Sequence, residues 1–239
     1  MRPGPLAIPF QSLNRLPGMP CFYGRRQGEL VEITGPDARH LARSLRARPG
    51  ERVSVVEPEG RLLQVRLTSV DDLRVTGQVE SEVEHRPEPS RSITLAVAAL
   101  PASALDLVLS RGTEVGAAEF VLVAAERCVA RARPGRADRW ATICREAAML
   151  ACRLVVPRVR GPLPFRQAWE EASSPYLLDR GGTPMRALED GATLFVGPEG
   201  GWAPDELDRA RGRVLSLGPR NLRSETAALV GLALALGSG

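Results

Sequence analysis

The sequence predicts an α/β protein in two parts, a small β-barrel followed by a larger domain with a mainly parallel sheet. Short strand-like segments separated by turns fill residues 19–86. After a proline-rich linker at 87–90, short apolar runs alternate with longer amphipathic segments through 91–239, as in sheets covered by helices on both faces. Two of the late apolar runs end in glycine-rich loops, which are typical of ligand sites.

The first part combines alternating strands with one helix. Residues 1–18 are rich in proline and leucine and lack periodicity, so we expect a loose extension there. An amphipathic helix is expected over 37–46, ending before Pro49-Gly50. Examples of the strand-like segments expected here are 30–33, 52–56, 62–67 and 73–79.

The second part has the pattern of a strand–helix alternation. Its short apolar runs are bounded by turn residues and are typical of buried strands. In the longer segments the apolar residues recur with helical spacing. We expect strands over 93–99, 120–123, 176–178, 193–196 and 214–217, and helices over 102–115, 137–153 and 224–236.

All 32 basic residues are arginine, and the chain contains no lysine. A GC-rich genome is one explanation of this bias. The physical consequence is that arginine binds phosphate bidentately, while no lysine is available as a base or Schiff-base nucleophile. The net charge of +4 is mildly basic and permits an RNA partner without requiring one.

Cysteine and histidine usage argues against a metal site. The four cysteines, at positions 21, 128, 144 and 152, form no close pair of metal-ligand type, so we expect reduced, buried and inert thiols. His40 and His85 are too few and too far apart, and we expect no metal. No apolar run reaches membrane-spanning length and no secretion signal is evident, so we expect a cytoplasmic protein with no membrane partner.

The most informative motifs are the two glycine loops. Gly197-Pro198-Glu199-Gly200-Gly201 follows the strand expected at 193–196, and the segment 217–227 follows the one expected at 214–217. Ligands bind at the carboxyl ends of strands in open α/β sheets, where glycine lets the backbone approach closely. The first loop is neither a dinucleotide-binding fingerprint nor a phosphate loop, and by itself it also fits a tight turn. Ser224 is a good N-cap for the helix that follows.

These paired motifs resemble the bacterial 16S rRNA uridine-N3 methyltransferases, a family of the SPOUT superfamily of knotted methyltransferases. The similarity extends to Phe22-Tyr23, His40-Leu41 and the run 111–116, and it covers residues 19–236. It implies an N-terminal PUA-like β-barrel and a C-terminal SPOUT-type α/β domain with a trefoil knot. It also implies a homodimer with each active site near the subunit interface, and 16S rRNA of the small ribosomal subunit as partner. The alternatives are a related knotted methyltransferase with another rRNA or tRNA site, or a catalytically silent RNA-binding homologue.

The resemblance further implies S-adenosyl-L-methionine bound by three loops, which are the segment after 176–178, the loop 197–201 and the segment 217–222. Family members tend to carry phenylalanine at Trp202, an aliphatic residue at Asn221, lysine at Arg111, and glutamine with a small polar residue at Leu150-Ala151. Trp202 either forms a wall of the adenine pocket or packs against the next helix.

The cofactor-binding residues implied by the resemblance are Leu177, Leu178, Val196, Gly197, Glu199, Gly200, Gly201, Leu217, Gly218, Asn221, Leu222 and Thr226.

Uridine methylation at N3 requires loss of a ring proton, which arginine cannot accept. We expect Arg223 to stabilise the uracil oxyanion, and Glu199 or Glu225 to take the proton directly or through water. The alternative is that Arg223 pairs with one of these carboxylates and braces the knot.

Two arginine groups are candidates for RNA binding, because phosphate neutralisation supplies most non-specific affinity. The first lies on one face of the helix expected at 37–46, where a solvated charged face is an equal alternative. The second surrounds a glycine-containing loop before the helix expected at 137–153. The two groups are Arg39, Arg43 and Arg46, and Arg127, Arg131, Arg133 and Arg136.

Overall fold

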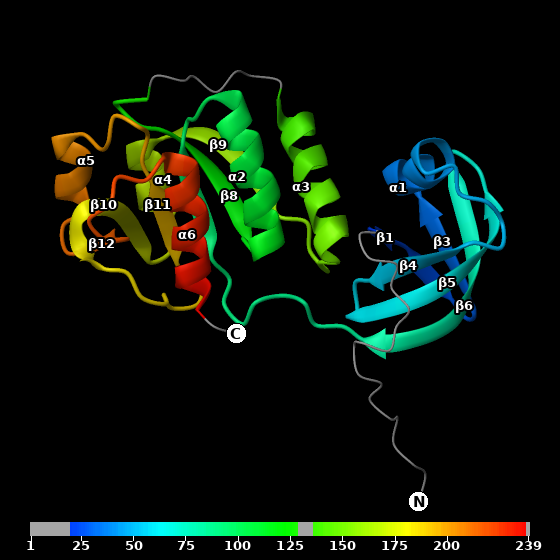
Figure 1. The fold of residues 1–239 in the computed structure, drawn as a ribbon. Helices are drawn as coiled ribbons and strands as arrows, with labels where there is room; N and C mark the ends of the chain where they lie inside the picture. The colour runs from blue at the N-terminus through cyan, green and yellow to red at the C-terminus, as the bar shows by residue number, and fades with distance from the viewer. Residues whose placement is uncertain (1–19, 129–135, 238–239) are drawn as a thin grey trace, which may run out of the picture. The chain divides into compact units, whose positions relative to one another are not determined.

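The computed structural model describes residues 20–128 and 136–237 (Figure 1). These residues divide into two compact units. The first contains the described residues up to Pro87 together with Ala148–Val155, and the second contains the remainder. Within the described ranges, no helix combines the length and apolar character needed to span a membrane.

The first unit is built on a curled six-stranded sheet in the order β1-β4-β5-β6-β3-β2 (Figure 1). β1 pairs with β4 in parallel, and the other neighbours are antiparallel. Its core includes Phe22, Ile33, Leu41 and Leu63, all fully buried. The strands are β1 (Cys21–Tyr23), β2 (Arg25–Gln27), β3 (Leu30–Thr34), β4 (Arg52–Glu57), β5 (Arg61–Val70) and β6 (Arg74–Glu84).

The helix expected at 37–46 lies two residues earlier in the chain than predicted and differs in form. It begins as α1 (Gly35–Arg39) and continues as a π-helical turn, η2 (His40–Ser44). Arg46 has a φ of 52°, in the left-handed region, so the helix has ended before this residue. The prediction that Arg46 shares a helix face with Arg39 and Arg43 is therefore wrong.

The assignment of residues 148–155 to the second part was wrong. Met149 packs in the core of the first unit, and Leu154 packs beside Val56 and Leu62. The Tyr23 hydroxyl donates a hydrogen bond to the carbonyl of Arg153 at 2.9 Å, and a ring nitrogen of His85 lies 2.6 Å from the carbonyl oxygen of Cys152. These contacts join residues that are far apart in the chain, and they place this segment in the first unit. Local hydrophobic periodicity carries no information about such contacts.

Two of the four cysteines are not free thiols, contrary to expectation. Cys21 on β1 and Cys152 form a disulfide within the first unit, and both residues are almost fully buried. They are separated by 131 positions, so spacing along the chain gave no indication of the pairing. Cys128 and Cys144 are not part of a disulfide.

The second unit contains a six-stranded sheet in the order β12-β10-β11-β7-β8-β9, with every neighbouring pair parallel. The expected strands and helices are all present, although the helix expected at 137–153 ends at 151. The sequence patterns missed β1 and β2 in the first unit, and β9, α4 and α5 here. The elements are β7 (Thr94–Ala98), α2 (Ala102–Val115), β8 (Glu119–Ala124), α3 (Ala137–Ala151), β9 (Arg158–Pro164), α4 (Phe165–Glu171), β10 (Pro175–Pro184), β11 (Thr193–Val196), α5 (Pro204–Arg209), β12 (Val214–Ser216) and α6 (Ser224–Leu236).

Side-chain alternation along the strands creates two apolar layers, one on each face of this sheet. Leu95 and Leu194 pack in the layer that includes residues of α2, α3 and α6. Ala96 and Phe195, one position further along each strand, face the other side of the sheet. They pack with Phe165 of α4 and with Ala210, the residue after α5. The expectation of helices on both faces of a parallel sheet is confirmed (Figure 1).

Loss of the disulfide is expected to lower the free energy of unfolding of the first unit by about 2–4 kcal/mol, because the cross-link restricts the unfolded chain over a long loop. Urea denaturation with and without reductant measures the difference. The control is the Cys21→Ser/Cys152→Ser double variant, whose unfolding should not respond to reductant. Equal curves for the oxidised and reduced wild-type protein would contradict the prediction.

Candidate functional site

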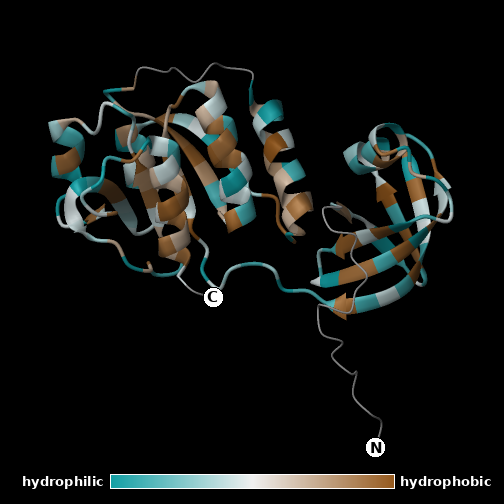
Figure 2. Ribbon diagram, viewed as in Figure 1, coloured by the Kyte–Doolittle hydropathy of each residue, from teal (hydrophilic) through white to brown (hydrophobic). Residues whose placement is uncertain are grey.

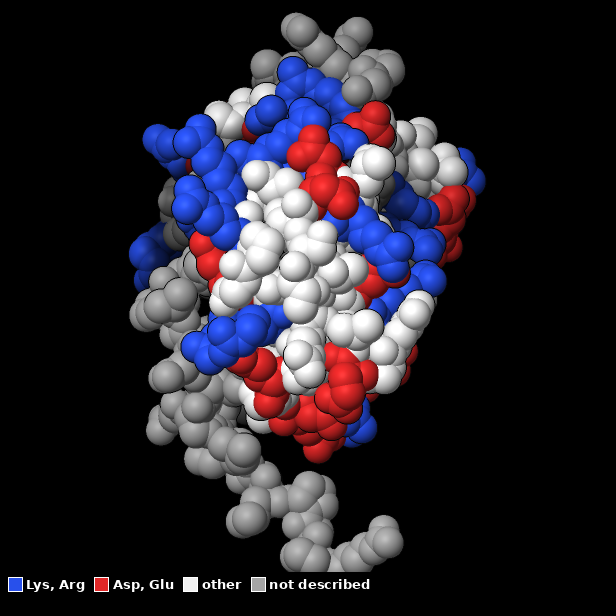
Figure 3. Space-filling view, turned by 90° about the vertical axis from the view of Figure 1, so that its right-hand side faces the viewer, with Lys and Arg blue, Asp and Glu red and all other residues white. Residues whose placement is uncertain are grey.

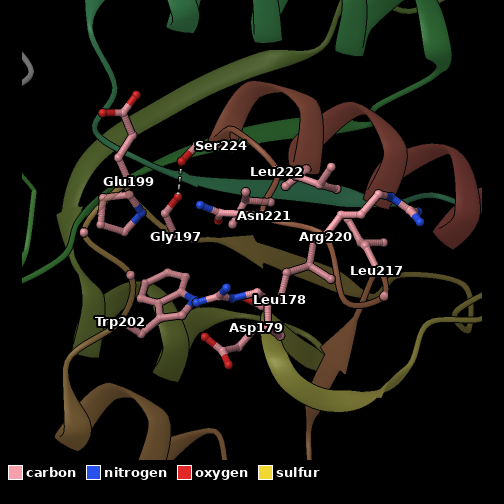
Figure 4. A pocket seen from close by; sticks show the side chains of 17 residues that line it. Leu178, Asp179, Gly197, Glu199, Trp202, Leu217, Arg220, Asn221, Leu222 and Ser224 are labelled. Carbon is pink, nitrogen blue, oxygen red and sulfur yellow. Dashed lines mark hydrogen bonds between the residues drawn. The ribbon is translucent and has the colours of Figure 1, made fainter.

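Residues 178–180 of β10 and the loops that follow β11 and β12 surround a pocket of about 290 Å³ (Figure 4). β10 pairs in parallel with both β11 and β12, and Leu178 lies beside Val196, the last residue of β11, so this part of β10 meets the carboxyl ends of the other two strands. The pocket is lined by Leu178, Asp179, Arg180, Val196, Gly197, Pro198, Glu199, Gly200, Gly201, Trp202, Leu217, Gly218, Arg220, Asn221, Leu222, Ser224 and Ala227.

Trp202 lines the pocket and also packs behind it, and its role as a wall for adenine stays a prediction. Its indole ring is 3% exposed and lies against Phe165, with ring centroids 5.2 Å apart. Its Nε1 donates a hydrogen bond to the carbonyl of Leu178 at 3.0 Å. A Cβ on Gly197 would lie 2.9 Å from two atoms of this indole, so glycine is required there for close packing.

Ser224 does not cap α6 through its side chain, contrary to expectation. The N-cap position belongs to Arg223, and no side-chain hydrogen bond caps the helix. The Ser224 hydroxyl instead donates to the carbonyl of Gly197 at 2.8 Å, shown as the dashed line in Figure 4. The two glycine loops predicted from the sequence are therefore in direct contact.

Most of the residues expected to bind a cofactor lie around this pocket. Leu177 does not, because it is fully buried among the residues that pack with Phe195. Thr226 is exposed and is also outside the lining. The predicted residues that do line the pocket are Leu178, Val196, Gly197, Glu199, Gly200, Gly201, Leu217, Gly218, Asn221 and Leu222.

Several polar lining residues belong to the expected cofactor loops but were not named individually. Asp179 and Arg180 lie in the segment after 176–178, which the resemblance assigns to cofactor binding. Arg220 belongs to the second glycine loop but was not singled out. Figure 4 shows Asn221 and Leu222 on one side of the pocket, with Trp202 and Asp179 on the other.

The three expected catalytic residues lie near the pocket but differ in placement. Glu199 lines it and is exposed, and its carboxylate points away from Trp202 and Asp179 in Figure 4. Arg223 and Glu225 flank the lining residue Ser224. The Arg223 side chain is 81% exposed and its Nη1 is 4.0 Å from Oε1 of Glu225, whose side chain is 20% exposed. A single exposed pair at this distance contributes little to stability.

The second arginine group is only partly described. Arg127 is exposed and its Nη1 lies 3.5 Å from the carbonyl oxygen of Gly200, so it belongs to the rim of the pocket. Arg136 is half-buried just before α3. Arg131 and Arg133 lie outside the described residues.

The first arginine group is dispersed rather than aligned. Arg39 is exposed, whereas Arg43 is paired with Asp72, and the hydrogen bond from Arg43 lowers the pKa of that carboxyl group. On the face seen in Figure 3, basic side chains gather toward the top and acidic side chains toward the lower end. Any phosphate contact at Arg43 has to compete with an existing ion pair.

Residues 20–128 and 136–237 contain no group of three or more histidine, cysteine, aspartate or glutamate side chains arranged to hold a metal ion. The polar groups of the lining residues are two carboxylates, two guanidinium groups, one amide, one hydroxyl, the indole N–H of Trp202 and backbone atoms. Together with its leucine and valine side chains, this lining suits an organic ligand with apolar and hydrogen-bonding parts.

Two family models match most of the chain. An RNA methyltransferase domain matches residues 86–236, and an RNA methyltransferase PUA domain matches residues 33–80. These ranges correspond to the main parts of the second and first units.

Curated relatives and solved structures agree with these matches. The chain is 33% identical over 236 residues to the ribosomal RNA small subunit methyltransferase E of Mycobacterium bovis, covering 86% of this chain and 85% of the relative. It is 31% identical over 218 residues to the protein of the same name from Synechocystis, with 85% and 71% covered. A crystal structure of the Neisseria gonorrhoeae ribosomal RNA small subunit methyltransferase E bound to S-adenosyl methionine superposes with a TM-score of 0.79. The two chains are 28% identical in sequence, and the superposition covers 90% of this chain and 95% of the Neisseria chain.

Proposed function

The chain belongs to the family of RNA methyltransferases that carry a PUA domain, and we propose that it methylates N3 of a uridine in 16S ribosomal RNA using S-adenosylmethionine. The observation that carries the proposal is the pocket formed by the two glycine loops and residues 178–180 of β10. A ribosomal RNA substrate in turn implies a cytoplasmic protein. The trefoil knot implied by the resemblance depends on chain threading, which strand order does not decide, and it stays a prediction.

The pocket residues fit this cofactor. Apolar side chains at Leu178, Leu217 and Leu222 offer a surface for a purine ring, and Asp179 supplies a carboxylate for ribose hydroxyls or a positive charge. Gly197 brings the backbone close to the cavity because the indole of Trp202 fills the space behind it. When bound, S-adenosylmethionine supplies an activated methyl group, so the protein's contribution is largely positioning and charge stabilisation.

Arg223 is the residue that we propose stabilises the uracil oxyanion as N3 loses its proton. Its exposure leaves the guanidinium accessible to an RNA base, and its neighbours on both sides line the pocket. Glu225, which is the more buried of the two candidate carboxylates, and Glu199 on the pocket rim are the proposed proton acceptors. Arginine keeps its proton and acts only as a donor.

A homodimer is proposed from the character of α6. The helix is apolar over most of its length (Figure 2). One side packs in the core through Ala228, Leu232 and Ala235, but Val230 and Leu234 are 41% and 44% exposed. A helix that is apolar on all sides is normally covered on all sides, so a second copy of the chain is the proposed cover.

Replacing Arg223 with alanine is expected to reduce the rate of methyl transfer by about 10²–10³-fold, the cost of removing one donor to a developing oxyanion. Tritiated methyl transfer to 30S subunits and to naked 16S rRNA measures the rate. Thermal unfolding should change little, because the side chain is exposed. Arg211→Ala is the matched control, since Arg211 is an exposed arginine paired with Asp208. Retained transfer by the Arg223 variant would exclude the catalytic role.

Glu225→Gln and Glu199→Gln, assayed separately, distinguish the two proposed acceptors. The variant in which the rate of methyl transfer falls at neutral pH identifies the carboxylate that accepts the proton.

Replacing Arg127 with alanine is expected to flatten the log–log salt dependence of RNA affinity by about one unit, because one phosphate contact is lost. Filter binding to 16S rRNA fragments at several salt concentrations gives the slope. Arg166→Ala provides the control, because Arg166 is an exposed arginine paired with Glu170 on α4. An unchanged slope for Arg127→Ala would place the phosphate contacts elsewhere.

The purified chain is expected to sediment as a dimer, and Val230→Glu with Leu234→Glu is expected to convert it to a monomer. Charged side chains on the proposed interface would have to be desolvated on association. Leu73→Glu, a change at an apolar side chain that is 75% exposed in the first unit, should leave the dimer intact. A monomeric wild-type protein at micromolar concentration would refute the dimer.

A further inference from the structure

We propose that Ser224 is a positioning residue for methyl transfer, and that its hydroxyl locks the Gly197–Gly201 loop onto the start of α6. This inference rests on the proposed function and concerns the same pocket. It assigns a role to a residue that lies between the proposed catalytic residues Arg223 and Glu225.

The first support is the direction of the Ser224 hydrogen bond. A serine at the start of a helix ordinarily bonds backbone N–H groups of its own first turn. Here the hydroxyl donates to the carbonyl of Gly197, 27 positions earlier in the chain, while α6 has no side-chain cap. Ser224 is 6% exposed, so water has little access to replace this bond.

The second support is the packing on the far side of Gly197. The indole of Trp202 lies where a Cβ on Gly197 would be, which prevents the loop from retreating in that direction. The indole is itself held by the hydrogen bond from its Nε1 to the carbonyl of Leu178. Two buried side-chain donors therefore connect Leu178 of β10, the loop after β11 and the start of α6.

The consequence for chemistry follows from chain connectivity. Ser224 is covalently joined to Arg223 and Glu225, so the position of its hydroxyl restricts where both charged side chains begin. Gly197 lines the proposed cofactor pocket, so the same bond relates the cofactor to these residues. Methyl transfer depends on alignment, and a displacement of about 1 Å can reduce a rate by about 10²-fold.

The test compares Ser224→Ala, which removes the donor, with Ser224→Thr, which retains a hydroxyl. Calorimetry with S-adenosylmethionine gives cofactor affinity without RNA, and single-turnover transfer to 30S subunits at saturating cofactor gives the rate. We expect the alanine variant to bind the cofactor about fivefold more weakly, the usual effect of losing one hydrogen bond. We expect its rate to fall at least tenfold, with the threonine variant restoring both values to within about threefold of wild type.

Ser54→Ala is the matched control. Ser54 is a buried serine of β4 whose hydroxyl accepts a hydrogen bond from Gln64 at 2.9 Å, so its loss tests the general effect of removing a buried hydroxyl. This variant should keep wild-type cofactor affinity and rate, even if its thermal midpoint falls. A midpoint change alone in Ser224→Ala, with affinity and rate unchanged, would show a merely structural role and overturn the proposal.

Trp202→Phe supplies a second, independent measurement. It removes the Nε1 donor and keeps an aromatic ring. If the two bonds hold the same loop, the affinity losses of Ser224→Ala and Trp202→Phe should not be additive in the double variant. Additive losses, or a threonine variant as impaired as the alanine variant, would refute the lock. If wild-type protein binds S-adenosylmethionine but transfers no methyl group to RNA, the proposed function fails, whereas the calorimetric comparison still decides whether the bond shapes the pocket.

Discussion

The parallel pairing of β10 with β11 and β12 is the constraint on which the functional site depends. Leu178 of β10 pairs with Val196 and Leu215, so residues 178–180 lie beside the segments that follow Val196 and Ser216, although the three are far apart in the chain. Glycine in two of these segments then allows close packing, most clearly where Trp202 lies against Gly197. The pocket is thus a consequence of strand direction combined with residue size.

Ion pairing restricts how the abundant arginines can be used. In the first unit, Glu82 accepts hydrogen bonds from Arg26 and Arg61, and the Arg26 bond is the main cause of the lowered pKa of its carboxyl group. Glu80 is held similarly by Arg52 and Arg66. A count of arginines therefore overstates the positive surface open to RNA. Exposed arginines outside such pairs, such as Arg127 on the pocket rim, are better candidates for phosphate contact.

The candidate site was largely predictable because its signals are local. Glycine spacing and the strand-end rule pointed to Gly197–Gly201 and to the loop beginning at Leu217, and both line the pocket. Leu177 does not line the pocket, because adjacent residues of a strand face opposite sides of the sheet and its side chain is buried beside Phe195. Its part in cofactor binding stays a prediction. Asp179 lies in the segment after 176–178 that the resemblance assigned to cofactor binding, although the residue itself was not named.

The sequence by itself determined the two-part organisation, most of the strands and helices, and the loops that form the pocket, because periodicity and turn chemistry act over a few residues. Only the tertiary structure joined Cys21 to Cys152, moved residues 148–155 into the first unit, and directed the Ser224 hydroxyl to Gly197. Each of these depends on segments that are distant in the chain and adjacent in space. Their proximity comes from burial and sheet pairing, which no local pattern encodes.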